Sequence, residues 1–448
     1  MIQDWFRQAK LGIFIHWGIY AVDGITESWS ITNGSYSYDD YMKQLDGFTA
    51  KNYDPKKWAK LIKAAGANYA VLTSKHHDGV ALFDTKHTDL NVVKKTPAGR
   101  DLIAPYCEAL REEGLHVGIY FTNTDWSDID NMRVIMDMSE QEVLDMRHTA
   151  QEYRQLWNGA CQIDADHGTQ DKAELEACWK RFMDRYRLGI TELLTNYGDV
   201  DLLWFDVMLQ RKGFSWETDK VRKMISDINP KTMVNARLLG QGDYETPELY
   251  IPLRALDDTW ELCTTFNNSW GYQPGDKKYK DIKQIVRMLC ECISKGGNLL
   301  ISIGPDAEGN IPKQTEEIML KLGEWTSKYA EAVYPTEKGP GAEYFVGGST
   351  LSKDKKTMYL FCYDRPNEFL MLNGIRNKKM KITSLKNNRE MDWEIVGGAP
   401  WVNMPGQIWI KTDDEDIDDV CTVIKVEFEE PVDFVEIRGN VSSVGGAE

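Results

Sequence analysis

The chain has 448 residues, and its acidic residues outnumber its basic ones by 70 to 53, which gives a formal net charge of −17. Nucleic acid is therefore not an expected partner, because neutralising phosphates requires clustered Lys and Arg. Hydrophobic residues make up 42% of the chain, but no apolar stretch approaches the roughly 20 residues of a membrane span. We expect a globular protein without a membrane partner, and a homo-oligomer is compatible with this composition.

The eight cysteines lie at scattered positions and form no Cys-x-x-Cys pair. The first residues, 1–7, contain no apolar segment typical of a secretory signal. Both features favour free thiols in a reducing compartment. We therefore expect a cytoplasmic protein, or a secreted or periplasmic one if the sequence is a trimmed form.

Apolar runs alternate with helical patterns over the first three quarters of the chain. Buried parallel strands read as continuous apolar runs, so this alternation predicts an irregular (β/α)8-like barrel of the TIM type over residues 1–335. The stretch 238–278 is mostly loop where a regular barrel has a helix. The predicted strands are 12–15, 69–74, 116–122, 200–206, 232–237, 259–264 and 298–303, and the predicted helices are 54–66, 100–113, much of 139–197, 216–228, 279–294 and 312–334.

The pattern changes after Pro335, where short alternating segments are separated by Gly, Asn and Asp turns. This pattern predicts a C-terminal antiparallel β-sandwich over residues 336–448. An acidic stretch at 413–419 lacks the glycine and spacing of a calcium-binding EF-hand loop, so we expect a solvated loop. The predicted strands are 343–347, 357–363, 367–372, 380–385, 392–396, 407–411 and 421–429.

Asp206 ends the apolar run Leu202–Phe205. A carboxylate is costly to bury without a partner or a function, and the catalytic residues of barrels gather at the carboxyl ends of their strands. The many aromatic residues of the chain, 15 Trp, 20 Tyr and 14 Phe, suit a carbohydrate site. A retaining glycosidase needs a second carboxylate about 5–5.5 Å from its nucleophile. The two candidates downstream are Glu248, on a loop, and Glu261, within a predicted strand.

His76 and His77 follow the second apolar run as an adjacent pair. Adjacent residues on a strand point to opposite sides, so the pair is not expected to bind one metal ion. No further His/Cys cluster accompanies them. We expect one ring to bind a sugar hydroxyl and the other to be structural, and we assign His16 and Trp17, which follow the first run, to the same site.

Several strings, in this order over residues 5–334, resemble the α-L-fucosidases of glycoside hydrolase family 29. The family also has a C-terminal β-sandwich, which the end of this chain resembles in pattern. The matching strings are KLGIFIHWG at 10–18, YDPKKW at 53–58, AAGA at 64–67, KHHDG at 75–79, VGIY at 117–120, LWFD at 203–206, WE at 260–261, SWGY at 269–272, SKGGNLL at 294–300 and IGP at 303–305.

The resemblance implies a retaining exo-glycosidase that removes terminal α-L-fucose from glycans without a metal or an organic cofactor. It implies that Asp206 is the nucleophile, that Glu248 is the first choice for the acid/base and that Glu261 is the second. The positions that it assigns to the sugar pocket are His16, Trp29, His76, His77, Tyr120, Trp204, Arg237 and Trp270.

Two departures from the family pattern leave other readings open. Val207 follows the nucleophile where the family usually has Gly, and Ser28 stands where Glu usually precedes Trp29. One alternative is an exo-glycosidase for a related sugar such as an α-L-galactoside. The others are a non-catalytic fucose-binding protein and a metal-dependent hydrolase.

Overall fold

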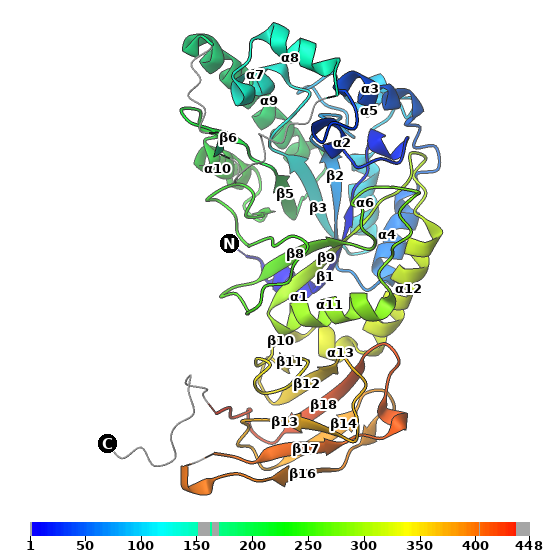
Figure 1. Ribbon diagram of the computed structural model, residues 1–448, viewed down its shortest axis with the longest axis vertical. Helices are drawn as coiled ribbons and strands as arrows, with labels where there is room; N and C mark the ends of the chain where they lie inside the picture. The colour runs from blue at the N-terminus through cyan, green and yellow to red at the C-terminus, as the bar shows by residue number, and fades with distance from the viewer. Residues whose placement is uncertain (1, 151–161, 164–169, 403, 436–448) are drawn as a thin grey trace, which may run out of the picture. The chain divides into compact units, whose positions relative to one another are not determined.

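The computed structural model describes residues 2–150, 162–163, 170–402 and 404–435 (Figure 1). The chain divides into two compact units. The first comprises residues 1–250, 260–280 and 300–320, and the second comprises residues 251–259, 281–299 and 321–448. The second unit takes in residues 281–299 as well as 321–448, so this division differs from the expected one. The domain boundary at residue 335 stays a prediction.

A seven-stranded parallel sheet, curled into part of a barrel, confirms the predicted fold class. Its strand order is β7-β5-β3-β2-β1-β9-β8. Strands β1, β2 and β9 are buried along their whole length, which explains their continuous apolar sequences. The strands are β1 Leu11–Ile15, β2 Tyr69–Lys75, β3 His116–Thr122, β5 Leu202–Asp206, β7 Met233–Val234, β8 Trp260–Thr265 and β9 Gly297–Ile303.

Residues 243–249 lie between the two edge strands, β7 and β8, and occupy the eighth position of the barrel. The amide of Asp243 donates to the carbonyl of Val234 on the β7 side, at 2.7 Å. On the other side, the amide of Cys263 in β8 donates to the carbonyl of Pro247, at 3.1 Å. An irregular segment thus completes the wall of the barrel within the stretch that we expected to be mostly loop.

Every second strand residue points into the barrel. The inward-facing residues form one buried cluster that includes Phe14 of β1, Val71 of β2, Tyr120 of β3, Trp204 of β5 and Cys263 of β8. This alternation determines which polar residues at the strand ends face the barrel mouth.

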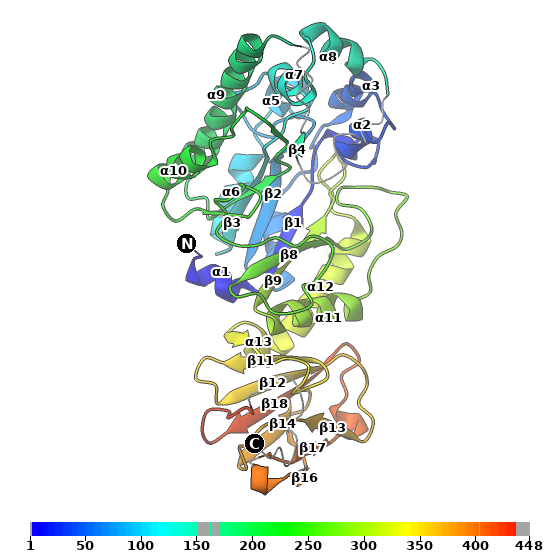
Figure 2. The same cartoon turned by 60° about the vertical axis from the view of Figure 1, so that its left-hand side comes forward.

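Helices connect the strands (Figures 1 and 2). Pro55 opens helix α4, and the side chain of Asp54 caps it by accepting from the amide of Lys57. The helix predicted in 139–197 becomes α8 and α9, and its parts at 151–161 and 164–169 lie outside the described residues. The helices are α1 Asp4–Ala9, α2 Trp29–Thr32, α3 Tyr38–Met42, α4 Pro55–Ala64, α5 Val92–Lys95, α6 Ile103–Glu112, α7 Ile129–Met136, α8 Glu140–Arg147, α9 Lys172–Asn196, α10 Thr218–Ile228, α11 Ile282–Ser294, α12 Lys313–Lys328 and α13 Ala330–Val333.

None of the helices in the described ranges is both long and apolar enough to span a membrane.

The second unit contains an antiparallel six-stranded sheet and an antiparallel three-stranded sheet around a common apolar core. The strand predicted at 343–347 is wrong, because this stretch is turn and bend around Gly347, which has a φ of 157°. The acidic stretch is not wholly solvated either, since Asp416 is buried and pairs with Arg389. The strands are β10 Thr336–Lys338, β11 Gly348–Ser352, β12 Thr357–Cys362, β13 Phe369–Leu372, β14 Met380–Ser384, β15 Arg389–Glu390, β16 Trp393–Val396, β17 Gln407–Lys411 and β18 Thr422–Phe428.

Candidate active site

Asp206 is the last residue of β5, and its side chain is 13% exposed. Trp204 faces the barrel interior, so alternation turns Asp206 in the same direction, one layer closer to the mouth. The hydroxyl of Tyr120 donates to Oδ2 of Asp206 at 3.0 Å, and Nε2 of His77 lies 3.5 Å from the same oxygen. Arg237 donates to the other carboxylate oxygen, Oδ1.

The surroundings of Asp206 favour its ionised form. Burial opposes ionisation, but the guanidinium of Arg237 and the ring of His77 outweigh this effect, so the pKa of Asp206 lies well below its usual range. The carboxylate is therefore charged over the whole physiological pH range, as a nucleophile must be.

Arg237 lies between two carboxylates. Its Nη1 donates to Asp206, and its Nη2 donates to Oε2 of Glu248 at 2.5 Å. The guanidinium also lies over the ring of Trp204, 4.6 Å from its centroid. Glu248 belongs to the segment in the eighth position of the barrel, and its side chain is 40% exposed. One planar cation thus holds a buried and an accessible carboxylate side by side at the mouth.

Glu261 points into the barrel, but it lies deeper than Asp206. Its side chain is fully buried, and Oε1 accepts from the indole of Trp204 at 2.8 Å. The hydroxyl of Tyr69 donates to Oε2 at 2.5 Å, and that of Tyr244 lies 3.3 Å from Oε1. Burial raises the pKa of Glu261 to about 7, against the lowering effect of these hydrogen bonds. Its two oxygens are thus already engaged with the residues that line the barrel interior.

His76 and His77 lie side by side, with ring centroids 4.3 Å apart, so the expectation that they point to opposite sides is wrong. Both residues follow the end of β2, and the pairing of β2 with β3 shifts register between Thr73 and Lys75. Such an irregularity redirects the side chains that follow it. His76 stacks on Tyr120 at 5.5 Å, whereas His77 faces Asp206.

His16 completes the group of imidazoles. Its ring lies 5.9 Å from that of His76, and its Nδ1 lies 2.8 Å from Oγ of Ser302. Burial lowers the pKa of His16 to about 3 and moves the pKa of His76 well below its usual value. Both rings are therefore neutral at pH 7 and can exchange hydrogen bonds with hydroxyl groups.

The tryptophans expected at the site fall into two groups. Trp270 lies 5.1 Å from the ring of His16, and Trp29 lies 5.6 Å from that of His77. Trp17 faces the outer side of the barrel wall instead, as expected for the neighbour of an inward-facing residue. It is buried among Phe48, Tyr53 and Trp58, and its indole donates to the carbonyl of Asp306.

Potential metal-ligand atoms of His76, His77 and Asp206 lie within 4.8 Å of one another. This proximity was not expected from the sequence, since it follows from the register shift. The arrangement does not suit a cation, however, because Arg237 already places its positive charge against Asp206. A second cation there would be repelled, whereas an uncharged polyhydroxylated ligand would not.

The comparison with known families agrees with this geometry. The α-L-fucosidase family model matches residues 1–331.

The chain belongs to the α-L-fucosidase family, glycoside hydrolase family 29.

Individual relatives point the same way. The chain is similar to the plasma α-L-fucosidase of Rattus norvegicus, with 29% identity over 74% of this chain and 70% of the relative. Among solved structures, α-L-fucosidase isoenzyme 1 from Paenibacillus thiaminolyticus matches with 32% identity and a TM-score of 0.79, over 95% of this chain and 98% of the other. The α-fucosidase of Thermotoga maritima matches with 26% identity and a TM-score of 0.71, over 94% and 96% of the two chains.

The two polar residues before Trp29 support the site through contacts that the sequence did not reveal. Ser28 is buried, and its hydroxyl lies 2.6 Å from Nδ1 of His76 and accepts from the amide of Asp78. The neighbouring Glu27 is also buried and accepts from the amide of Gly271, next to Trp270. The string ESW at 27–29 was the available signal, but only the folded loop shows that Ser28 contacts the imidazole while Glu27 fixes the backbone.

Val207, the second departure from the family pattern, has a left-handed backbone with a φ of 36°. A β-branched side chain is strained in this region, and glycine is not. The amide of Val207 donates to Oδ1 of Asp206 at 2.9 Å. The strained peptide thus contacts the carboxylate directly, which is the kind of position where strain accompanies function.

Proposed function

We propose that this chain is a retaining exo-α-L-fucosidase in which Asp206 is the nucleophile and Glu248 is the acid/base. The observation that carries the proposal is that Arg237 binds both carboxylates at the barrel mouth. Membership of the α-L-fucosidase family supplies the substrate class.

In the first step, Asp206 attacks the anomeric carbon of the α-L-fucoside, and the bond to the leaving oxygen breaks. Glu248 donates its proton to that oxygen, so the aglycone departs as an alcohol and leaves a β-linked fucosyl ester on Asp206. Splitting the reaction at a covalent intermediate and assisting the leaving group each lower the barrier.

In the second step, the Glu248 carboxylate takes a proton from water, and the resulting oxygen nucleophile attacks the same carbon. The ester bond to Asp206 breaks, which releases α-L-fucose and returns both carboxyl groups to their starting states. The partial exposure of Glu248 suits this role, since water must reach it. Glu261 does not suit it, because its oxygens are engaged in the interior.

We assign recognition of the sugar hydroxyls to His16, His76 and His77, whose rings surround the Asp206 carboxylate. Trp270, beside His16, offers an apolar face for the methyl group on C5 of fucose. Tyr120 and Trp204 form the wall, and Trp29 lies beside His77. The contacts of Trp17 with other buried aromatics support a structural role for this residue instead.

The stereochemistry of azide products tests both carboxylate assignments. For Asp206→Gly, azide attacks the substrate directly and gives β-L-fucosyl azide, with inversion. For Glu248→Ala, azide attacks the fucosyl ester and gives α-L-fucosyl azide, with net retention. Proton NMR of the products of an activated aryl fucoside distinguishes the two anomers. Near-normal turnover by Asp206→Gly would show that this residue is not the nucleophile. Formation of α-L-fucosyl azide by Glu261→Ala, and not by Glu248→Ala, would assign the acid/base role to Glu261.

The departures at Ser28 and Val207 favour one second candidate, an exo-glycosidase for α-L-galactosides, which differ from α-L-fucosides only by a hydroxyl on C6. Comparison of kcat/KM for the two aryl glycosides tests it, and we expect the fucoside to be preferred. Binding of fucose without hydrolysis of either glycoside would indicate the non-catalytic alternative.

We also propose a cytoplasmic location and a fucosylated glycan as the natural partner. All the cysteines in the described ranges are free and buried, as is typical of a reducing compartment. Fractionation of cells that produce the protein checks the location.

A further inference from the structure

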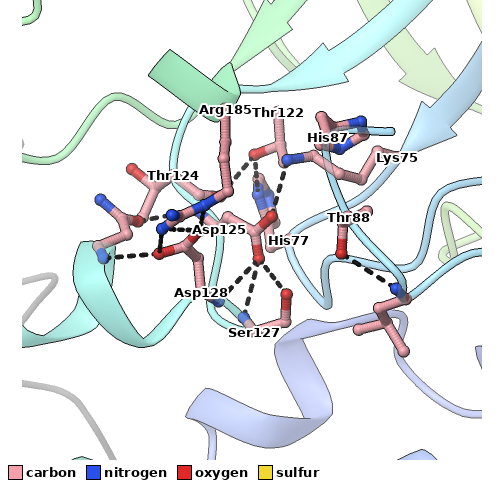
Figure 3. A network of polar contacts seen from close by, with 12 residues as sticks. Lys75, His77, His87, Thr88, Thr122, Thr124, Asp125, Ser127, Asp128 and Arg185 are labelled. Carbon is pink, nitrogen blue, oxygen red and sulfur yellow. Dashed lines mark hydrogen bonds and ion pairs between the residues drawn. The ribbon is translucent and has the colours of Figure 1, made fainter. Parts of the chain in front are cut away.

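A buried ion pair lies next to the proposed site without contributing to it directly (Figure 3). Lys75 ends β2, and its Nζ donates to Oδ2 of Asp125 at 2.7 Å. The two side chains are only 2% and 6% exposed, and the ammonium also lies 4.5 Å from the ring centroid of Phe121. Buried ion pairs give little net stability, because desolvation offsets the attraction between the charges. Its role is therefore sought in the groups that it holds in place rather than in stability.

The second oxygen of Asp125 organises the chain that follows β3. Oδ1 accepts from the amide of Ser127 at 2.9 Å, from the hydroxyl of Ser127 at 2.6 Å and from the amide of Asp128 at 3.2 Å. The amide of Asp125 itself donates to Oδ1 of Asn131 at 3.0 Å. Both carboxylate oxygens are thus engaged, and residues 122–128 fold around them (Figure 3).

The segment 122–128 contacts His77 in three ways. The hydroxyl of Thr122 lies 2.5 Å from Nδ1 of the ring. The amide of Trp126 donates to the carbonyl of His77 at 2.9 Å, and the ring of Trp126 packs on the imidazole with centroids 4.8 Å apart. The orientation of His77 towards Asp206 therefore depends on where this segment lies.

The same segment also contacts the backbone of the proposed nucleophile. The amide of Asn123 donates to the carbonyl of Asp206 at 2.9 Å, and the amide of Thr124 donates to the carbonyl of Val207 at 3.1 Å. The segment thus connects the end of β2, through Lys75 and His77, with the end of β5.

We propose that the Lys75–Asp125 ion pair positions Asp206 and His77 by fixing segment 122–128, so that breaking the pair slows fucosyl transfer to Asp206 beyond what a loss of stability explains. This inference rests on the proposed function. Neither residue is a catalytic residue here, since both act through the segment. Misplacing a reacting group by about 1 Å lowers rates up to about 100-fold.

A second buried ion pair in the same unit offers a matched control. Arg211 of β6, Gln210–Arg211, lies 2.8 Å from Asp137, and the side chains are 7% and 4% exposed. Asp137 is the residue that caps the C-terminus of helix α7, and Arg211 also donates to the carbonyl of Val134 in that helix. This pair ties β6 to α7, so Asp137→Asn removes a comparable charge at a different place.

The experiment compares Asp125→Asn with Asp137→Asn in the full chain. The probe is 2-deoxy-2-fluoro-α-L-fucosyl fluoride, whose reaction measures transfer to the nucleophile, and thermal denaturation measures stability. Both variants are expected to lower the Tm, but only Asp125→Asn should slow labelling, by about 10- to 100-fold. For Asp125→Asn, the inhibition constant of free fucose should change by a smaller factor than kcat for hydrolysis of α-L-fucosyl fluoride.

Equal labelling rates in the two variants would overturn the proposal. If Asp125→Asn does not fold, the double variant K75M/D125N decides, because it removes both charges of the buried pair while the amide oxygen of Asn can still accept from Ser127 and Asp128. Slow labelling at a restored Tm supports the positioning role, and a restored rate refutes it. Failure of the wild-type protein to react with the probe or to hydrolyse fucosyl fluoride would instead contradict the proposed function itself.

Discussion

The variant Glu261→Gln tests whether the carboxyl group of Glu261 is structural or catalytic. In the unfolded chain Glu261 has the ordinary glutamate pKa of 4.5, and in the folded protein burial raises its pKa to about 7. The folded state therefore holds the proton more tightly than the unfolded state does. The resulting stabilisation is fully present below pH 4.5 and is lost as the pH rises to about 7. The difference between the two pKa values corresponds to a total loss of about 3 kcal/mol.

Glutamine at position 261 does not titrate, so the variant avoids this loss. Its free energy of unfolding, relative to that of the wild type, should rise by about 2.5 kcal/mol between pH 5 and pH 8. Urea denaturation at the two pH values measures the difference. The amide oxygen can still accept from Trp204, and an amide N–H can donate to the hydroxyl of Tyr69, so the barrel interior should remain intact.

Glu248→Gln provides the control, because that side chain is 40% exposed and lies at the mouth. We expect Glu248→Gln to remove most of the activity towards fucosyl disaccharides, by about 10²- to 10⁴-fold, while Glu261→Gln keeps it. The structural role of Glu261 would be refuted if the stability difference between Glu261→Gln and the wild type did not change with pH. It would also be refuted if Glu261→Gln folded normally but lost turnover.

Three further outcomes follow from the site. Arg237→Lys should lower kcat/KM about 100-fold, since an ammonium cannot hold Asp206 and Glu248 in the planar geometry of a guanidinium; an unchanged value would contradict the bridging role. Val207→Gly should raise the free energy of unfolding by about 1 kcal/mol by relieving backbone strain, and urea denaturation measures this change. The same variant should lower kcat in steady-state kinetics, because the peptide beside Asp206 gains freedom. A less stable variant would show that the backbone at position 207 is not strained. Treatment with a chelator should leave hydrolysis unchanged, whereas a loss that is reversed by added metal would indicate an ion at His77 and Asp206.

The sequence predicts much of the barrel because buried parallel strands have an unmistakable composition. Residues 69–74 and 116–122 were expected as strands and lie in β2 and β3. Segment 243–249 was not recognised, because Pro247 and the polar residues around it do not form an apolar run. Its place in the barrel wall depends on hydrogen bonds to β7 and β8, which are long-range contacts.

The sequence also suggests the composition of the site but not the direction of every side chain. The direction of Glu261 depends on the phase of β8 and on which layer of the barrel it reaches, and neither is visible in the string WELC. The pair of His76 and His77 was misjudged because strand alternation was extended past a register shift. Lys75 and Asp125 are 50 residues apart, so only the folded barrel reveals the pair.

Covalent trapping tests the central claim most directly. The wild-type protein is treated with 2-deoxy-2-fluoro-α-L-fucosyl fluoride, digested with a protease, and its labelled peptide is sequenced by mass spectrometry. The label is predicted on Asp206, at the end of the peptide stretch LLWFD. A label on any other carboxylate, or turnover of α-L-fucosides without a fucosyl ester at this position, would contradict the account.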